Sequence, residues 1–537
     1  MRRILLALLL TVFFSTLAFA DSGETIRIGL EAKYKNASEV PLGDKTLHVG
    51  FGNFNESAVI HGASFSVVPT NMYYLRVLRD FNNYGEARGA ADEYAAQGVK
   101  TCVALLGDNL FAVYFGGYKT EGDAPQGAYP QTVTLPPDSR RVCILEGGEP
   151  YLVFDNPSGF GVIRAENTTF VGTREYRGVI ELYRNENGIT PVNVVDFEQY
   201  LYSVVPGEMP SGWNAEALKA QAVVARTYAL YRSAAKPYPN YDLCDISCQV
   251  YNGAAVESQE STAAVVATRG VLVRYNGAPI EAVFSASNGG VTAASADVWG
   301  GDAPYLQSIE TTEQGGLEWV REYTTAQISS MAEGKGYSIG SVLGVTIGDT
   351  QSGRVNSLII QGTNGAVTLE KEQIRSFFSS DSYLPSRLFT IGASSEKEML
   401  IARIHNNTDI ALPVFSQVSD SSVCIVSTSG MDLADYDNLY MYSEGVSQKI
   451  PFGVSVMIGG GHTVYMQKPE QAVYANTPLA PLDNNKGATV SGAAVVFVGR
   501  GNGHGAGMSQ WGAKSLADSG FNYKDILKHY YANTEVY

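Results

Sequence analysis

The segment YLYSVVPGEMPSGWNAEALKAQAVVARTYAL (200–230) constrains the fold more than any other part of the chain. Its apolar start, residues 200–205, predicts a strand, which the Pro-Gly pair that follows would end. Asn214 has a side chain that caps helices, and small apolar residues then recur at helical spacing, which predicts a helix to about residue 234. Glu208 is therefore expected on a tight turn between two rigid elements. The residues expected on the packed face of the helix are Ala215, Leu218, Ala222, Ala225 and Ala229.

The neighbours of Glu208 in the sequence are apolar, which bears on the chemistry of its carboxyl group. Val204, Val205 and Met209 tend to exclude water from the carboxylate, and loss of water disfavours the charged form and raises the pKa. A glutamate with a raised pKa can protonate a glycosidic oxygen near neutral pH. The residues alone leave an alternative open, in which Glu208 is a solvated loop residue or the ion-pair partner of a cation such as Arg226.

The rest of the chain reads as short strands with glycine, asparagine and serine at the turns. The 32 tyrosines suit half-exposed strands. Because the 537 residues exceed the ~100–200 that one domain usually contains, several domains are expected. The sequence therefore predicts an α+β fold that is rich in strand, with one long helix after the Glu208 turn.

The N-terminus and the net charge limit the compartment and the partners. Arg2 and Arg3 precede an apolar run at 4–14, and Ala-Phe-Ala (18–20) supplies the small residues that a signal peptidase requires. We expect an extracytoplasmic protein, secreted or associated with the cell wall, and contact with a membrane only if the segment stays uncleaved. The net charge of −16 argues against nucleic acid and anionic membranes as partners, and is compatible with a largely neutral polysaccharide or a protein.

Residues 66–125 have an order of elements of their own. Strand-like 73–78, helix-like 84–97 and two further strand-like runs, 101–106 and 110–115, make a β-α-β-β pattern. This pattern resembles the sporulation-related (SPOR) repeat fold, which implies binding to glycan strands stripped of their peptides. A generic α+β insertion without a binding role is the alternative.

A second resemblance covers most of the chain. The segment 200–230 closely resembles the signature of the stage II sporulation protein D / amidase enhancer (SpoIID/LytB) family, and GRGNGHGAGMSQWGAKSLADSGFNYKDILKHYYANTEV (499–536) resembles its terminal block. The other matching blocks are TIRIGL (25–30), YDLCDISCQVYNG (241–253), VFSASNGGVT (283–292), DVWGGDAPYLQSI (297–309) and SGRVNSLIIQG (352–362). They follow one another in order and are interrupted by the SPOR-like segment and by residues 402–482.

The resemblance implies a lytic transglycosylase that cleaves peptidoglycan glycan strands to 1,6-anhydro-muramic acid ends, in sporulation or cell-wall remodelling. Glu208 matches the family's catalytic acid and would act as both acid and base. A hydrolase usually needs two carboxylates, and Asp297 and Asp302 are the open candidates for a second. The alternatives are an amidase enhancer, which binds glycan and stimulates a partner wall amidase without catalysis, and a structural wall protein.

Seven further residues are candidates for binding the glycan: Lys219, Arg226, Tyr228, Ser285, Ser287, His504 and Gln510. Lys219 and Arg226 share a face of the predicted helix. The serines belong to the FSASNGG block and would form a groove wall. His504 lies in a glycine-rich loop that allows close approach of a ligand, and it is either a donor to sugar or a structural histidine satisfied within the loop.

Five cysteines are present, and Cys244 and Cys248 are close in sequence. Some family members hold zinc here with two cysteines and two histidines, but this chain has no histidine between His61 and His405. A disulfide is therefore expected in an exported protein, with zinc as the alternative and no other cofactor.

These patterns predict the following boundaries: 1–20 signal peptide, 21–65 N-terminal strands of the SpoIID-like domain, 66–125 SPOR-like module, 126–401 SpoIID-like catalytic domain, 402–482 β-rich insertion and 483–537 C-terminal block of the SpoIID-like domain.

Overall fold

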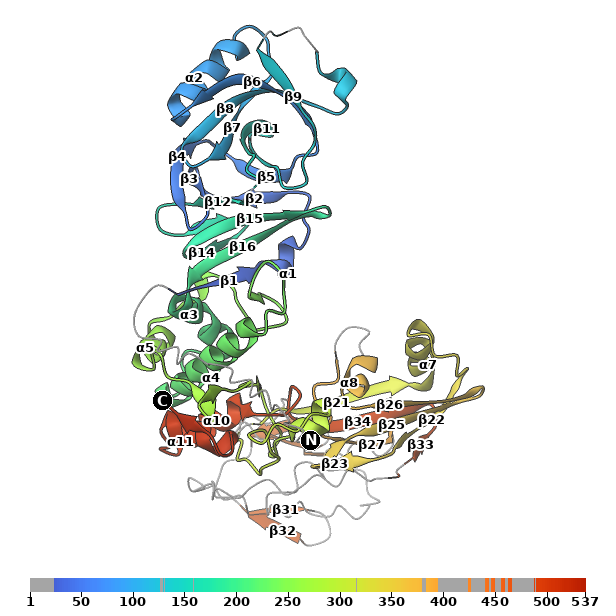
Figure 1. Cartoon of the computed structure of the whole chain (residues 1–537). Coiled ribbons are helices and arrows are strands. Elements are labelled where there is room, and N and C mark those ends of the chain that lie inside the picture. The colour runs from blue at the N-terminus through green and yellow to red at the C-terminus, as the bar shows by residue number, and fades with distance from the viewer. Residues whose placement is uncertain are drawn as a thin grey trace, which may run out of the picture.

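The computed structural model describes residues 24–125, 129, 131–157, 159–314, 316–378, 383–394, 487 and 489–537, with the backbone of five short strands between 424 and 465. Strands make up 38% of the residues and helices 25%, which confirms a strand-rich α+β fold. The molecule has three parts in space: a tall β-rich arm, a helical layer at the base of the arm, and a second β-rich unit beside that layer (Figure 1). The predicted signal peptide lies outside the described residues. None of the helices that the structure describes is long and apolar enough to cross a membrane.

The lower part of the arm is a seven-stranded sheet that brings together distant segments. In this sheet β1 pairs with β16 in the antiparallel direction and with β17 in the parallel direction. Strand β16 also forms a hairpin with β15. The first family-like block therefore lies beside the cysteine-containing block. In spatial order the strands are β17 (Leu243–Cys244), β1 (Thr25–Gly29), β16 (Gly188–Asp196), β15 (Val179–Asn185), β12 (Gly161–Arg164), β3 (Thr46–Phe51) and β4 (Asn55–His61).

The upper part of the arm is a ten-stranded sheet that contains the predicted β-α-β-β segment. Asn83 caps α2 (Tyr84–Ala95) by accepting a hydrogen bond from the Glu86 amide, and α2 packs on β7 and β8. The expected boundaries at 66 and 125 fall within one continuous sheet, because strands from outside that segment pair with it, and glycan binding here stays a prediction. In order the strands are β14 (Arg174–Tyr176), β13 (Thr169–Val171), β2 (Val40–Leu42), β5 (Phe65–Pro69), β10 (Val142–Glu146), β11 (Glu149–Phe154), β7 (Thr101–Gly107), β8 (Leu110–Tyr118), β6 (Tyr73–Phe81) and β9 (Thr132–Leu135).

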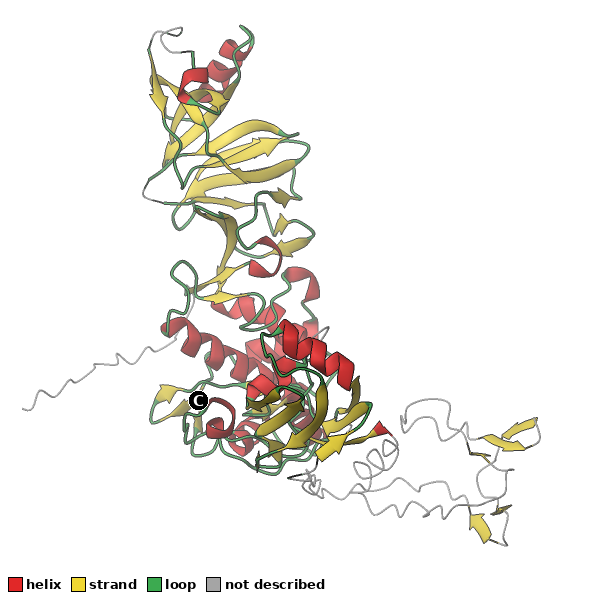
Figure 2. Ribbon diagram, turned by 90° about the vertical axis from the view of Figure 1, so that its right-hand side faces the viewer, coloured by secondary structure: helices red, strands yellow, loops and turns green. Residues whose placement is uncertain are grey.

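The helical layer is built around α4 (Ala215–Ala234), which Asn214 caps as predicted by accepting from the Glu216 amide. Helices α3, α5, α10 and α11 pack against it, so α4 is buried on nearly all sides rather than on one face, although Ala215 at its start is exposed. Most of the helices of the molecule gather below the β-rich arm (Figure 2). The surrounding helices are α3 (Phe197–Glu208), α5 (Gln259–Ala267), α10 (Gln510–Asp518) and α11 (Tyr523–Tyr530).

The strand predicted at 200–205 is wrong, because these residues belong to helix α3. Asp196 caps this helix by accepting hydrogen bonds from the amides of Glu198 and Gln199, and the Pro-Gly pair forms its last turn instead of ending a strand. The apolar run is buried between the sheet and neighbouring helices, and a short buried run has no periodicity that separates helix from strand.

A second unit has its own hydrophobic core, within the range expected to belong to the catalytic domain. Ile328, Leu358, Phe377 and Phe497 are among its buried residues. Strand β34 returns the chain to this core after the 402–482 region. Its elements are β21 (Glu318–Thr324), α7 (Thr325–Gly334), β22 (Val342–Ile347), β23 (Thr350–Gln351), β24 (Arg354–Val355), β25 (Ser357–Gly362), β26 (Gly365–Glu370), α8 (Glu372–Phe377), β27 (Phe389–Ala393), β33 (Thr489–Ser491) and β34 (Ala494–Arg500).

The predicted insertion at 402–482 lies largely outside the described residues. Its described parts are β28 (Cys424–Ile425), β29 (Tyr440–Ser443), β30 (Val446–Lys449), β31 (Ser455–Ile458) and β32 (His462–Tyr465), which pair as antiparallel strands.

Arg226 joins α3 to α4 as a buried cation. Its side chain is 2% exposed and forms two hydrogen bonds of 2.7 Å with the carboxylate of Glu198, and further bonds reach the carbonyl oxygens of Val265 and Val271. The partner of Arg226 is therefore Glu198 rather than Glu208. Because Arg226 is buried between the helices, its position does not support the predicted contact with glycan.

We expect Arg226→Met to lower the free energy of unfolding by about 3–5 kcal/mol, because it leaves the Glu198 carboxylate buried without its cation. Thermal and urea unfolding of the full chain, followed by circular dichroism, measure the change. Arg232→Met on the same helix is the control, since its pair with Glu281 is about one-third exposed and should contribute less than about 1 kcal/mol. Equal losses in the two variants would contradict the structural role of Arg226.

Candidate active site

Glu208 is the last residue of α3, and a short loop joins it to α4. The next residue, Met209, is fully buried, and its amide closes the helix on the carbonyl oxygen of Val205 at 2.9 Å. Glu208 thus lies between two rigid elements as expected, but both are helices.

Two groups from distant segments hold the Glu208 carboxylate. The backbone amide of Val250 donates to Oε1 at 2.7 Å, and the side chain of Gln510 forms a second hydrogen bond. A Cβ atom at Gly207 would lie 3.0 Å from Val250 Cγ1, so glycine permits the close approach of this loop to the helix end. The carboxylate is thereby fixed by the C-terminal block and by the cysteine-containing block.

Burial raises the pKa of Glu208 above its usual 4.5, and the hydrogen bonds from Val250 and Gln510 partly oppose the rise. Residue Glu208 is half-buried rather than fully enclosed. The geometry therefore supplies what a general acid requires, a partly desolvated carboxyl group in a fixed orientation.

Gln510 is brought to the site as predicted, through its hydrogen bond with Glu208. Its Nε2 also donates to Oε1 of Gln221 at 3.4 Å, and Gln221 is fully buried within α4. The sequence analysis missed Gln221. A lone amide among the small apolar residues of α4 is the signal that would have found it, because buried polar groups need partners.

The loop that carries Val250 is anchored on both sides. Asn252 donates its amide to Ser203 Oγ at 3.2 Å, and Tyr251 donates its hydroxyl to Asn193 at 2.6 Å. Gln249 donates its side-chain amide to the carbonyl oxygen of Ala225 at 3.1 Å. These bonds tie the loop to α3, β16 and α4, so the amide that faces Glu208 has little freedom to move.

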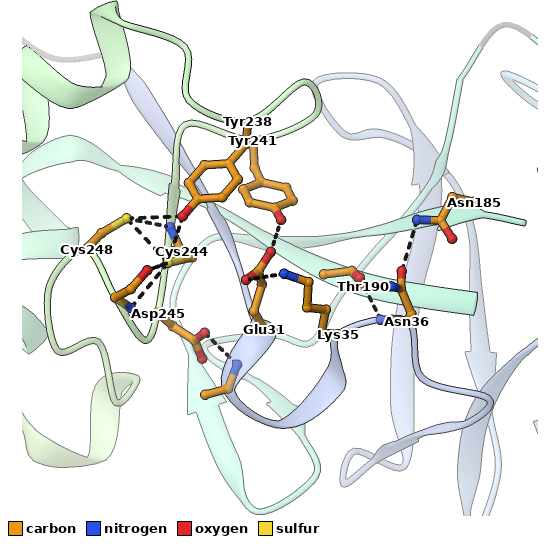
Figure 3. Close-up of polar contacts among 12 residues, drawn as sticks. Glu31, Lys35, Asn36, Asn185, Thr190, Tyr238, Tyr241, Cys244, Asp245 and Cys248 are labelled. Atoms are coloured by element: carbon orange, nitrogen blue, oxygen red, sulfur yellow. Dashed lines mark hydrogen bonds and ion pairs between the residues drawn. The ribbon is translucent and has the colours of Figure 1, made fainter. Parts of the chain in front are cut away.

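Cys244 and Cys248 lie at the start of this block, beside the stacked rings of Tyr238 and Tyr241 (Figure 3). The predicted disulfide is absent. Both residues are free thiols whose sulfur atoms lie 3.3 Å apart, whereas a disulfide requires about 2.05 Å. The contact with Cys248 lowers the pKa of Cys244, and the Tyr238 hydroxyl also donates to the Cys244 sulfur at 3.2 Å.

The surroundings of the two cysteines do not fit a zinc ion. Zinc in proteins is usually held by four ligands, and across the described ranges no three histidine, cysteine or acidic residues gather closely enough to hold a metal. The nearby acidic side chains are engaged elsewhere, since Asp245 accepts from the Ala32 amide and Glu31 accepts from the Tyr241 hydroxyl (Figure 3).

Ser287, one of the two predicted serines, contacts a buried carboxylate, that of Glu313, which was not predicted from the sequence. Glu313 is 6% exposed and accepts hydrogen bonds from Ser287 Oγ, the amides of Asn288 and Gly289, and Ser509 Oγ. Ser285 donates to the side chain of Asn288 at 2.8 Å. These contacts make both serines part of the support for the loop next to Gln510.

His504 is held within its loop. Its Nδ1 accepts from the Ala506 amide at 3.0 Å, and its ring also hydrogen-bonds with the backbone of Phe284. Burial lowers the pKa of His504 to about 4, so the ring is neutral at physiological pH. These contacts therefore favour a structural role for His504 over a role as a hydrogen-bond donor to sugar.

The remaining candidate residues are Lys219, Tyr228, Asp297 and Asp302. Lys219 forms a partly exposed ion pair with Glu216 at 2.6 Å. Tyr228 packs edge-on to Phe284, and burial raises its pKa to about 12. Asp297 is 1% exposed and accepts from Ser352 at 2.7 Å, while Asp302 is exposed. In the part of the chain that the structure describes, no carboxylate contributes to the pKa shift of Glu208.

Comparison with known proteins places the site within a matched region. A family model described as Stage II sporulation protein matches residues 185–275, and a model described as a domain of unknown function matches residues 305–405. The first range contains Glu208, Gln221 and Val250. The second range largely coincides with the unit that has its own core.

Three curated relatives are similar over parts of their length. The Amidase enhancer of Bacillus subtilis (strain 168) is 29% identical over 344 residues, which are 62% of this chain and 40% of the relative. The Stage II sporulation protein D of the same organism is 29% identical over 215 residues, 36% of this chain and 61% of the relative. An uncharacterized protein of Brachyspira hyodysenteriae is 36% identical over 161 residues, 29% of this chain and 41% of the relative. The matches thus span between 40% and 61% of these relatives.

We expect Glu208→Gln to raise the midpoint of thermal unfolding at pH 7 to 8. Because the folded-state pKa of Glu208 is raised, its contribution to stability is fully present below about pH 4.5 and is lost as the pH rises through the folded-state pKa. Glutamine avoids that loss, so the gain in midpoint should disappear as the pH falls below 4.5. Calorimetry of the parent and of Glu208→Gln across pH 4 to 8 measures the difference between their unfolding midpoints.

Glu216→Gln is the control with the opposite sign. Burial raises the pKa of Glu216, but the side chain of Lys219 and the amide of Tyr523 outweigh this effect and lower it overall. Its contribution to stability is present above the usual pKa and is lost as the pH falls, so this variant should be less stable than the parent at pH 7. A pH-independent effect of Glu208→Gln would contradict the assigned shift.

Proposed function

We propose that this chain, which belongs to the stage II sporulation protein D family through residues 185–275, cleaves the glycan strands of the bacterial cell wall as a lytic transglycosylase. The observation that carries the proposal is the position of Glu208, a half-buried carboxyl group with a raised pKa at the end of a helix. The same proposal places the protein outside the cytoplasm, at the wall.

One carboxyl group suffices for this reaction. Protonated Glu208 gives its proton to the glycosidic oxygen, and the bond from that oxygen to C1 of muramic acid breaks. The Glu208 carboxylate then takes the proton of the C6 hydroxyl of the same sugar, and the C6 oxygen bonds to C1, which closes the 1,6-anhydro ring. Water enters neither product, and Glu208 ends protonated as it began.

The contacts of Glu208 suit both halves of this cycle. Burial favours the protonated form that the first half needs, and the bonds from Val250 and Gln510 stabilise the carboxylate that the second half needs. Glycosidases that use water or a covalent intermediate need a second carboxylate at about 5–9.5 Å.

A second candidate function is that of an amidase enhancer, which binds glycan and stimulates a separate wall amidase. The observation that favours it is the relative named Amidase enhancer, whose match extends over 62% of this chain. In this function Glu208 performs no chemistry, and a cell-wall amidase is the partner.

The two candidates differ in their products. We expect the full chain, incubated with peptide-free glycan strands, to release 1,6-anhydro-muramic acid ends that mass spectrometry detects. Glu208→Gln should lower the rate by at least about 100-fold, since it removes the acid. Asp302→Asn, which neutralises an exposed carboxylate, should retain the parent rate.

Unchanged activity in Glu208→Gln would reject Glu208 as the acid. Binding of glycan without cleavage by the parent, together with faster release of stem peptides from intact peptidoglycan by an added wall amidase, would favour the enhancer function instead.

A further inference from the structure

Two tryptophans from distant segments meet next to the proposed acid. Trp213 lies on the loop between α3 and α4, and Trp511 lies in the first turn of α10. Their ring centroids are 4.9 Å apart with 60° between the ring planes, and both side chains are half-buried. Part of this aromatic pair therefore faces solvent.

The backbone holds both rings in place. The amide of Trp511 donates to the carbonyl oxygen of Ala286 at 3.0 Å, and the side chain of Asn214 donates to the carbonyl oxygen of Ala517 at 3.1 Å. These bonds fix the N-terminal end of α10 on the FSASNGG block and its C-terminal end on the start of α4. The aromatic surface is thus rigid before any ligand arrives, which lowers the entropic cost of binding.

The pair is continuous with the site of Glu208. Trp511 directly follows Gln510, whose side chain hydrogen-bonds with Glu208, and Trp213 belongs to the loop that begins at Glu208. Both tryptophans thus neighbour, along the chain, residues that form the site of Glu208.

The indole N–H groups are unused. Within the described residues neither has a hydrogen-bond partner, and neither is among the buried polar atoms without a partner. By contrast Trp319 is 7% exposed in the second core and donates its N–H to Ser386 Oγ at 3.3 Å. A tryptophan that serves packing alone resembles Trp319, whereas the Trp213–Trp511 pair presents open donors. The ammonium group of Lys514 lies 5.9 Å from the centre of the Trp213 ring, so the exposed surface of the pair is aromatic with one cation at its side.

We propose that the Trp213–Trp511 pair is a saccharide subsite, which binds a neutral N-acetylated hexose ring of a glycan strand. The C–H groups of the ring would lie on an indole face, and an indole N–H would donate to a hydroxyl or acetamido oxygen. A neutral ring suits an acidic chain of net charge −16, which gains no long-range attraction for an anion. The proposal rests on the proposed function and adds the residues that position the strand against Glu208.

Binding is measured in the full chain carrying Glu208→Gln, so that no turnover occurs, by calorimetric titration with peptide-free glycan oligosaccharides. We expect Trp511→Ala and Trp213→Ala each to weaken the Kd about tenfold. The milder Trp511→Phe and Trp213→Phe retain a packed ring, and together they should abolish the change in tryptophan fluorescence that the glycan causes in the parent.

Two controls separate a subsite from a packing role. Trp319→Phe removes a buried tryptophan and should leave both the Kd and the fluorescence change intact. Phe521→Ala removes a ring that is 45% exposed just beyond α10 and should also leave the Kd unchanged. Thermal unfolding of each variant shows which of them remain folded.

While the parent binds glycan, a Kd that is unchanged in the folded alanine variants, or a fluorescence change that persists when both tryptophans are replaced by phenylalanine, would overturn the subsite and leave the proposed function intact. Absence of glycan binding by the parent would instead overturn the proposed function, and the subsite with it.

Discussion

The buried carboxylate of Glu313 connects the two loops on which the site depends. It accepts from Ser287 and from the amides of Asn288 and Gly289 on one loop, and from Ser509, which lies 196 positions after Glu313, on the other. A buried carboxylate is costly unless it is fully hydrogen-bonded, so these donors must assemble around it when the chain folds. Ser509 also caps α10, which places Gln510 at the first position of that helix. The geometry at Glu208 therefore depends on a carboxylate that does not touch it.

A second set of buried charges fixes the neighbouring unit to the same loops. Arg354 is 1% exposed and donates to the carbonyl oxygens of Asn288 and Val291 at 2.7 Å, and a Cβ atom at Gly505 would collide with its guanidinium group. Burial lowers the pKa of Arg354 to about 10, so it stays charged at neutral pH. The glycine-rich loop that the sequence offered as a ligand-binding feature thus accommodates an arginine of the protein itself. Its glycines leave room for the close contact between this loop and the neighbouring unit.

Local signals in the sequence were sufficient for some parts of the fold and insufficient for others. The cap at Asn214, helix α4 and the β-α-β-β order of β6 to β8 were predictable, because capping and periodicity are properties of neighbouring residues. The helix at 200–205 was not, because a fully buried run carries no periodicity. Gln221 and Glu313 were missed because their partners are not local: Gln510 lies 289 positions from Gln221, and the partners of Glu313 lie between 24 and 196 positions away. Ser287 was predicted as a groove wall, yet its hydroxyl turns to Glu313, which no pattern along the chain reveals.

Protonated Glu208 is the species that the first step of the proposed reaction requires. Infrared difference spectroscopy, with spectra of Glu208→Gln subtracted from those of the parent at each pH, isolates the carboxyl band of this residue. The burial of Glu208 predicts that the band of the protonated carboxyl persists above pH 4.5, the usual pKa of glutamate. A band that disappears at or below pH 4.5 would contradict the central claim.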